Sequence, residues 1–271
     1  MENEIKDQEI YLSRISKPLQ EKLRVAKYIP KWAQTILDVG CADGTVTFAL
    51  AKLFPDVQFL GIDLNESFIK KAQQQVVDEG IKNVKFECVY LRQILNRTER
   101  FDSVIFVSVL HEFFSYGEGI SSVLKAVSDA HEMLNSKGEI IIRDMIFSEY
   151  KKYTVFMADS IKQKINSLKD LNSKVSDFEK YFGQMDSIYQ INHFLLKYMY
   201  SENWDREGKE NYVPVSFDQY EKIFSLLGME LQFKDYYLID FLKQKWKTDF
   251  GFSEDELENL KSTGFMVAKK K

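Results

Sequence analysis

Short apolar segments alternate with amphipathic segments through the first half of this 271-residue chain. Runs rich in valine, isoleucine and phenylalanine are typical of buried strands, whereas apolar residues three and four apart are typical of helices. The pattern predicts strands at residues 35–39, 58–62, 84–89, 101–107 and 139–142. It predicts helices at residues 45–54, 66–77 and 123–134. Strands that alternate with helices in this way form a parallel sheet covered by helices on both faces.

The alternation stops after the fifth predicted strand. Residues 147–213 show helical spacing only, and we predict that they form a helical cap inserted into the sheet domain. After the cap, the sequence again predicts elements of the sheet domain. These are a helix at 217–227, which Ser216 can cap, and strands at 229–239 and 263–268. We therefore predict an α/β fold with a seven-stranded, mostly parallel sheet. We predict three units: an N-terminal helical segment at 1–33, a sheet domain at 34–146 and 214–271, and the cap at 147–213. The N-terminal segment contains a predicted helix at 19–32.

Composition excludes several classes of protein. Hydrophobic residues make up 45% of the chain, which is enough for a packed core and excludes a disordered polymer. Lys and Arg (37) nearly balance Asp and Glu (41), so the chain has no general attraction for polyanions. Two cysteines cannot form a disulfide framework, the polar start lacks the apolar core of a secretion signal, and no apolar run has the length of a membrane span. We therefore expect a cytoplasmic protein that does not insert into membranes.

A turn that contains glycine joins the first strand to the first helix, with Asp38, Gly40 and Gly44 in the pattern Asp-x-Gly-x-x-x-Gly. Glycine adopts positive φ angles and carries no Cβ, so a ligand can lie against the backbone and the helix N-terminus. About 20 residues further on, Asp63 ends the second predicted strand, where a carboxylate can accept both hydroxyl groups of a ribose. A dinucleotide-binding turn would need Gly-x-Gly-x-x-Gly, which this turn does not contain.

These residues resemble the motifs of a known family. The turn from Asp38 to Gly44 resembles the first motif of the class I S-adenosylmethionine-dependent methyltransferases, and Asp63 resembles the second. Residues 101–107 are similar to the fourth-strand signature of that family, and residues 134–142 to its turn into strand five. The resemblance implies a Rossmann-like fold and the cofactor S-adenosyl-L-methionine, with S-adenosyl-L-homocysteine as product. It implies cofactor contacts at the strand ends by Asp38, Gly40, Cys41, Ala42, Gly44, Asp63, Leu64, Tyr90, Val107 and Ser108.

The resemblance also implies roles within this set. Asp38 and the two glycines would line the methionine part of the cofactor, and Asp63 would hold the ribose. Members often carry an aspartate near the end of strand three for the adenine amino group, whereas this chain has Tyr90, which can stack on adenine instead. We interpret Cys41 as a small packing residue rather than a nucleophile, because no base adjoins it in the sequence.

Candidate catalytic residues follow the fourth predicted strand. His111 and Glu112 lie there, at the carboxyl edge of the sheet, where open α/β folds bind their ligands. His111 can take a proton from a substrate hydroxyl or amine, because an unperturbed histidine titrates near neutrality. The alternative is that His111 starts a helix or forms a wall of the cofactor site. The Asn/Asp-Pro-Pro-aromatic motif of members that methylate amides and adenine is absent.

Candidate substrate-binding residues follow strand five and lie in the predicted cap. Arg143 and Asp144 either point into the cleft or pair with one another. His193, Trp204 and Arg206 lie in a segment that we expect to cover the cleft, with structural roles as the alternative. None of the three histidines has the i, i+4 spacing of a zinc site, so we predict that the protein binds no metal.

The sequence leaves three functions open. The first is an S-adenosylmethionine-dependent methyltransferase that transfers a methyl group to an O or N atom of a small molecule, which fits an enclosing helical cap. The second is an RNA methyltransferase, although acidic residues nearly match the basic residues of the cap, so no basic groove is visible. The third is a methyltransferase-like protein that binds the cofactor without turning it over, which the departure at Tyr90 keeps open.

Overall fold

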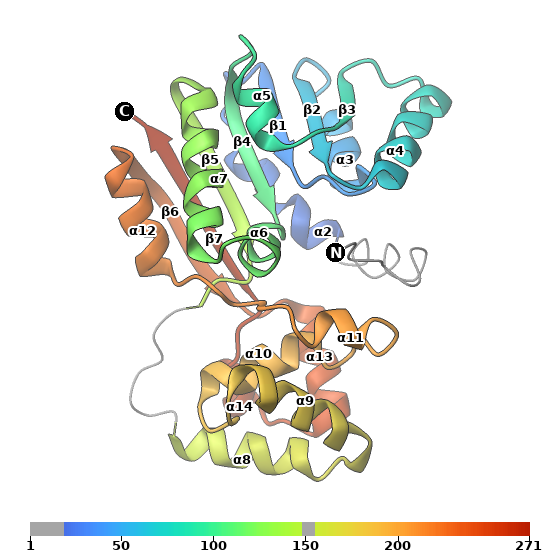
Figure 1. Cartoon of the computed structure of the whole chain (residues 1–271), viewed down its shortest axis with the longest axis vertical. Helices are drawn as coiled ribbons and strands as arrows, with labels where there is room; N and C mark the ends of the chain where they lie inside the picture. Colours follow the sequence, from blue (N-terminus) through green and yellow to red (C-terminus); the bar gives the residue numbers. More distant parts are fainter. Residues whose placement is uncertain (1–18, 148–154) are drawn as a thin grey trace.

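A computed structural model describes residues 19–147 and 155–271, and its centre is one sheet with seven strands (Figure 1). The spatial order is β3-β2-β1-β4-β5-β7-β6. Strands β1 to β5 run parallel, whereas β7 is antiparallel to both β5 and β6. The predicted seven-stranded, mostly parallel α/β sheet is confirmed. The strands are β1 Thr35–Val39, β2 Gln58–Asp63, β3 Val84–Cys88, β4 Phe101–Val107, β5 Leu134–Asp144, β6 Met229–Tyr237 and β7 Thr263–Lys270.

Helices cover both faces of the sheet because the central strands are apolar on both sides. Successive residues of a strand point to opposite faces, so Ile105 packs into one core while Val104 and Phe106 pack into the other. The core around Ile105 is closed by α3 (Thr45–Leu53), α4 (Glu66–Glu79) and the 3-10 helix η1 (Leu23–Tyr28). The opposite core is closed by α5 (Leu91–Leu95), α6 (Leu110–Tyr116), α7 (Ile120–Met133) and α12 (Phe217–Leu226).

Local signals set the ends of several helices. The side chain of Asn65 accepts hydrogen bonds from the backbone N–H groups of Ser67 and Phe68 and begins α4, and Gly80 ends it with a φ of 63°. Ser216 begins α12 by bonding the N–H of Gln219, as we predicted from the sequence. The ends of these helices are therefore set by capping side chains and by a glycine with positive φ.

A second layer of helices lies beyond the carboxyl ends of the parallel strands, below the sheet in Figure 1. Its own apolar core contains Phe178, Phe194, Trp246 and Phe252, all with less than 2% of their surface exposed. We call this layer the cap. Besides helices of the predicted insertion it contains two helices from the segment between β6 and β7. The cap helices are α8 Val155–Asn166, η3 Lys169–Leu171, α9 Asn172–Phe182, α10 Ile188–Lys197, α11 Trp204–Glu207, α13 Asp240–Phe250 and α14 Glu254–Glu258.

Some boundaries differ from the sequence prediction. The helix expected at 19–32 is shorter, with one turn of α-helix, α2 (Leu19–Lys22), followed by η1. The expected turn at Lys137 and Gly138 lies inside β5, where Lys137 has a φ of 65°. The parts of the predicted N-terminal segment and cap at residues 1–18 and 148–154 lie outside the described residues. Among the helices that are described, none combines the length and apolar character needed to cross a membrane.

Candidate active site

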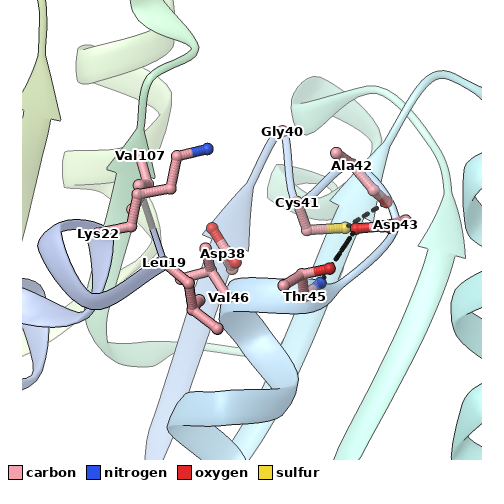
Figure 2. Close-up of a pocket in the computed structure, with 10 residues that line it drawn as sticks. All are labelled: Leu19, Lys22, Asp38, Gly40, Cys41, Ala42, Asp43, Thr45, Val46 and Val107. Carbon is pink, nitrogen blue, oxygen red and sulfur yellow. Dashed lines mark hydrogen bonds between the residues drawn. The ribbon is translucent and has the colours of Figure 1, made fainter. Parts of the chain in front are cut away.

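The turn from β1 into α3 lines a pocket at the carboxyl edge of the sheet (Figure 2). The pocket has an empty volume of about 380 Å³. Strand β1 contributes Asp38, the turn contributes most of the floor, and Lys22 of α2 reaches in from the opposite side. The complete lining is Leu19, Lys22, Asp38, Gly40, Cys41, Ala42, Asp43, Thr45, Val46 and Val107.

The turn itself requires glycine at position 40. Gly40 has a φ of 72°, and the N–H groups of Gly40 and Cys41 both donate to the carbonyl of Ile62 in β2, at 2.8 and 3.0 Å. A Cβ atom on Gly40 would lie 2.3 Å from Cγ2 of Val109, which follows β4. The absence of a side chain therefore lets the turn approach the loop after β4. Cys41 is buried, and burial raises the pKa of its thiol well above the ordinary value, which agrees with a packing role.

Asp63 joins the end of β2 to the same turn. One carboxylate oxygen accepts the N–H of Ala42 at 2.9 Å, and the other accepts the N–H of Asn65 at 2.8 Å. Burial raises the pKa of Asp63, although these backbone hydrogen bonds oppose the shift. Each carboxylate oxygen can accept two hydrogen bonds, so both oxygens keep a lone pair for the hydroxyl groups of a ligand.

Charged side chains of both signs line the pocket, namely Asp38, Asp43 and Lys22. Asp38 is 2% exposed and accepts a hydrogen bond from the hydroxyl of Thr47 at 2.6 Å. Burial raises its pKa to about 6, while Thr47 and the charge of Lys22 act in the other direction. Burial lowers the pKa of Lys22 to about 8, which leaves this lysine largely protonated at neutral pH. The pocket thus presents an acidic and a basic group to a ligand.

The remaining predicted cofactor residues lie at or near this edge. Val107 lines the pocket, and the hydroxyl of Ser108 accepts a hydrogen bond from Arg143 at 3.1 Å. Leu64 and Tyr90 follow β2 and β3 and are 56% and 64% exposed. Tyr90 is therefore an exposed aromatic residue just after β3, the strand that pairs with β2 and Asp63. Gly44 has a φ of 79° and packs against Phe86 at the start of α3 rather than lining the pocket.

A second group of polar side chains lies where the sheet meets the cap. His111, at the start of α6, is buried, and its Nδ1 lies 2.7 Å from an Asp144 oxygen while its Nε2 lies 3.2 Å from a Glu210 oxygen. Burial lowers the pKa of His111, but the two carboxylates more than offset this effect and raise the pKa well above the ordinary value. His111 thus lies in a buried network with Asp144 and Glu210, and its role as a base stays a prediction.

The end of α11 and the loop after it supply two buried glutamates, of which Glu210 was missed from the sequence. Glu207 and Glu210 are almost completely buried, and the hydroxyl of Tyr116 donates to Glu210 at 2.6 Å. Arg206 lies 3.0 Å from Glu207, 3.6 Å from Glu112 and 3.8 Å from Glu210. The predicted substrate residue Arg206 is thus surrounded by carboxylates of this chain.

Glu112 is half-buried and is the most accessible carboxylate of this group, with 34% of its side chain accessible. Burial of the carboxyl group raises its pKa to about 7, with the charge of Glu210 as the next cause. The charge of Asp63 acts in the same direction, which places Glu112 within electrostatic reach of the turn on β1 and β2. Val109, which precedes α6, lies against Gly40 of the turn, so the polar group adjoins the pocket at the carboxyl edge.

Buried groups hold the loop after α11 in place. Lys197 of α10 has no exposed surface and donates to the carbonyls of Glu207 at 3.2 Å and Glu210 at 2.6 Å. Nε2 of His193 accepts the N–H of Tyr212 at 3.1 Å, and this histidine is completely buried. The structure replaces the expected substrate contact of His193 with a structural role, because a side chain in the cap interior cannot touch a bound substrate.

Three other predicted substrate residues also have internal partners. Trp204 donates to Asp177 at 3.1 Å and anchors α11 on the cap. Arg143 is buried, donates to the backbone carbonyl of Glu21 at 3.2 Å, and ties α2 to the sheet. Asp144 accepts hydrogen bonds from His111 and from backbone N–H groups, so it does not form the expected pair with Arg143. These contacts favour the structural alternative for all three.

Comparison with known proteins identifies related sequences over part of the chain. A family model described as "Methyltransferase domain" matches residues 31–211. A tRNA (guanine-N(7)-)-methyltransferase of Rubrobacter xylanophilus is 36% identical over 58 residues, which is 21% of this chain and 26% of that protein. A malonyl-[acyl-carrier protein] O-methyltransferase of Bacillus cereus is 39% identical over 70 residues, which is 26% of this chain and 24% of that protein. The chain thus matches about a quarter of the length of these curated relatives.

Solved structures share the fold over most of the chain. The plantazolicin methyltransferase BpumL, crystallised with a desmethyl analogue and S-adenosylhomocysteine, aligns with a TM-score of 0.56 and 13% identity over 98% of this chain and 91% of its own. At this identity the likeness concerns the fold alone. Since the family model matches more than half of the chain, the protein belongs to the methyltransferase domain family, and its sheet is that of the class I S-adenosylmethionine-dependent methyltransferases.

Proposed function

We propose that this protein transfers a methyl group from S-adenosyl-L-methionine to an O or N atom of a small molecule. The observation that carries the proposal is the pocket at the turn after β1, with Asp63 beside it and Asp38 and Lys22 in its lining. An amino-acid group carries an ammonium and a carboxylate, which these two side chains of opposite charge can match. Both oxygens of Asp63 keep acceptor capacity for ribose hydroxyls. The residues present therefore fit this cofactor.

The reaction mainly requires the protein to position the acceptor atom relative to the methyl group. When bound, the cofactor supplies a methyl group on a sulfonium whose leaving group is neutral. The chain has to hold the acceptor atom in line, exclude water with the cap, and receive a proton from a hydroxyl or ammonium acceptor. The carboxylate of Glu112, at the junction of sheet and cap, can receive such a proton.

Charge at the junction favours a small neutral or cationic acceptor over RNA. Four carboxylates, from Glu112, Asp144, Glu207 and Glu210, surround Arg206 and His111. Phosphate groups bind where cations exceed anions, and this junction has the reverse balance. A basic face elsewhere on the chain would be needed for an RNA substrate.

A transfer experiment tests the proposed function. Purified protein with methyl-labelled S-adenosylmethionine and fractionated cell extract should place the label in the small-molecule fraction. Label in RNA would favour the second function, and its recovery should then fall steeply as salt rises. A folded protein that binds the cofactor but labels no fraction would support the third function, a binding protein without turnover.

Replacing Asp63 with alanine is expected to weaken the binding of S-adenosylhomocysteine at least about tenfold, or about 1.4 kcal/mol. The variant loses the carboxylate that would accept the ribose hydroxyls, and it also frees the N–H of Ala42. Isothermal titration calorimetry measures the change. Asp56→Ala, at an exposed position before β2, is the matched control and should bind like the wild type. Equal affinities of all three proteins would contradict the role of Asp63.

The affinity for S-adenosylhomocysteine should depend on the ionisation of Asp38. Its pKa of about 6 means that the carboxyl is neutral below that pH and loses its attraction for the ligand's ammonium group. The groups that face it are Lys22 of α2, Thr47 of α3 and Asp63 of β2, and Lys22 stays protonated because its pKa is about 8. Affinity should therefore fall about tenfold as the pH drops from about 7 to about 5.

Calorimetry at several pH values checks this prediction. Asp38→Asn should bind weakly at every pH and show a flatter profile, because the asparagine does not titrate in this range. A wild-type affinity that is constant across the range, or that rises as the pH falls, would show that Asp38 does not face the ammonium group.

A further inference from the structure

Three potential metal ligands from two distant parts of the chain meet at the junction of sheet and cap. His111 and Glu112 begin α6 directly after β4, and Glu210 lies in the loop that follows α11. One histidine nitrogen and one oxygen from each glutamate all lie within 4.8 Å of one another. A single cation placed among three such atoms can bind all of them after small side-chain movements, since metal bonds to N and O are about 2.0–2.2 Å long.

The ring of His111 is held in the orientation that a metal ligand needs. Asp144 accepts the proton of Nδ1 at 2.7 Å, and the backbone N–H groups of Val109 and Met145 hold Asp144 in place. Nε2 consequently faces Glu210, at 3.2 Å. Histidines that bind metals usually have a carboxylate or carbonyl behind the ring in this way, which fixes the tautomer and leaves the other nitrogen free for the ion.

Of the two glutamates, Glu210 is a buried ligand, whereas Glu112 lies at the accessible side of the site. Glu210 is 2% exposed, and the hydroxyl of Tyr116 holds its Oε2 at 2.6 Å while Oε1 faces His111. Glu112 keeps 34% of its side chain accessible. An ion can therefore enter past Glu112 and keep a coordination position for a further ligand, which is the arrangement of catalytic rather than purely structural metal sites.

The local charge balance suits a divalent cation. With His111 neutral, the carboxyl groups of Glu112, Asp144, Glu207 and Glu210 face two cationic side chains, the guanidinium of Arg206 and the ammonium of Lys197. Arg206 makes its short contact, 3.0 Å, with Glu207, and lies 3.6 Å or more from the two potential ligands. The guanidinium thus sits at the edge of the group, and an ion of charge +2 at its centre would offset most of the remaining negative charge.

We infer that His111, Glu112 and Glu210 bind one divalent first-row transition-metal ion, such as Mn²⁺ or Zn²⁺. Mixed imidazole and carboxylate ligands favour these ions over Mg²⁺ and Ca²⁺, which take oxygen ligands. Binding through Nε2 releases the proton of the His111 ring to solvent. This inference replaces the prediction that the protein binds no metal. That prediction considered ligand spacing along the sequence, and Glu210 is too far from His111 for any spacing rule.

The consequence for catalysis rests on the proposed function. Glu112 follows Val109 by three residues, and the side chain of Val109 lies against Gly40 of the turn, so the metal site adjoins the cofactor pocket. A hydroxyl oxygen of the acceptor bound there would be oriented toward the methyl group and would lose its proton more easily. An acceptor with a hydroxyl group that can coordinate a metal is therefore the substrate class that this site favours.

Metal binding to the 271-residue chain tests the inference. The protein is treated with a chelator, dialysed, and titrated with MnCl₂ and separately with ZnCl₂ near neutral pH by calorimetry, and the loss of the free Mn²⁺ signal is followed by electron paramagnetic resonance. We expect one ion per chain. Glu112→Gln, at the accessible position, and Glu210→Gln should each weaken binding at least about tenfold. Glu256→Gln is the matched control, because Glu256 is a buried cap carboxylate that pairs with Lys164 elsewhere, and it should bind the ion like the wild type.

Two results would overturn the inference. One is folded, metal-free wild-type protein that takes up neither ion at about 1 mM, a concentration that detects even weak binding. The other is binding that Glu112→Gln and Glu210→Gln leave unchanged. Circular dichroism verifies that each variant is folded. S-adenosylhomocysteine binding, measured on the same metal-free samples, reports separately on the proposed function, so the failure of one proposal is distinguishable from the failure of the other.

Discussion

Replacing Asp144 with alanine is expected to lower the free energy of unfolding by about 3–5 kcal/mol. Asp144 is 2% exposed and is the acceptor for the ring of His111 and for the backbone N–H groups of Val109, His111 and Met145. Alanine leaves these donors without an acceptor and leaves the histidine next to an empty space. The loss is large because buried polar groups that lose their partners cannot be hydrated by solvent.

Urea unfolding followed by circular dichroism measures this change. Asp129→Ala is the matched control, because Asp129 is also an aspartate of low exposure but has one partner, Arg92, which is 69% exposed. The control should lose at most about 1 kcal/mol, as expected for an ion pair at the surface. An Asp144 variant no less stable than the Asp129 variant would show that the network around His111 contributes little to folding.

Replacing Gly40 with alanine is expected to cost about 2–4 kcal/mol of stability and to abolish the binding of S-adenosylhomocysteine. Two effects add. The φ of 72° is unfavourable for a residue with a Cβ, and that Cβ would lie 2.3 Å from Cγ2 and 2.9 Å from Cβ of Val109. Val109 is branched and buried, so it cannot turn away. The turn has to move, and the pocket that it lines changes shape.

Gly80→Ala separates the two effects. Gly80 ends α4 with a φ of 63°, but an added Cβ there would meet no atom within 4 Å. This control should lose only about 1 kcal/mol from backbone strain and bind the ligand normally. The double variant Gly40→Ala, Val109→Ala should recover part of the lost stability. Equal losses at positions 40 and 80 would mean that the close approach to Val109 does not matter.

Most of the sheet could be predicted from the sequence because its signals are local. Apolar runs marked all seven strands, and the caps Asn65 and Ser216 lie next to the helices that they begin. The glycine turn with Asp63 was visible for the same reason, since positive φ angles and strand ends are set by neighbouring residues. The sequence analysis left residues 240–262 unassigned, although Gly251 ends α13 and Ser253 begins α14 through local signals. That these helices pack in the cap is set by tertiary contacts.

The sequence by itself determined the strands, the turn after β1 and the acidic residue at the end of β2, because each depends on residues a few positions apart. Only the tertiary structure brought Glu210 to His111 and buried His193 inside the cap. The physical reason is that burial and charge act through space. A histidine's protonation depends on which carboxylates surround it, and those carboxylates come from segments whose distance along the chain carries no signal.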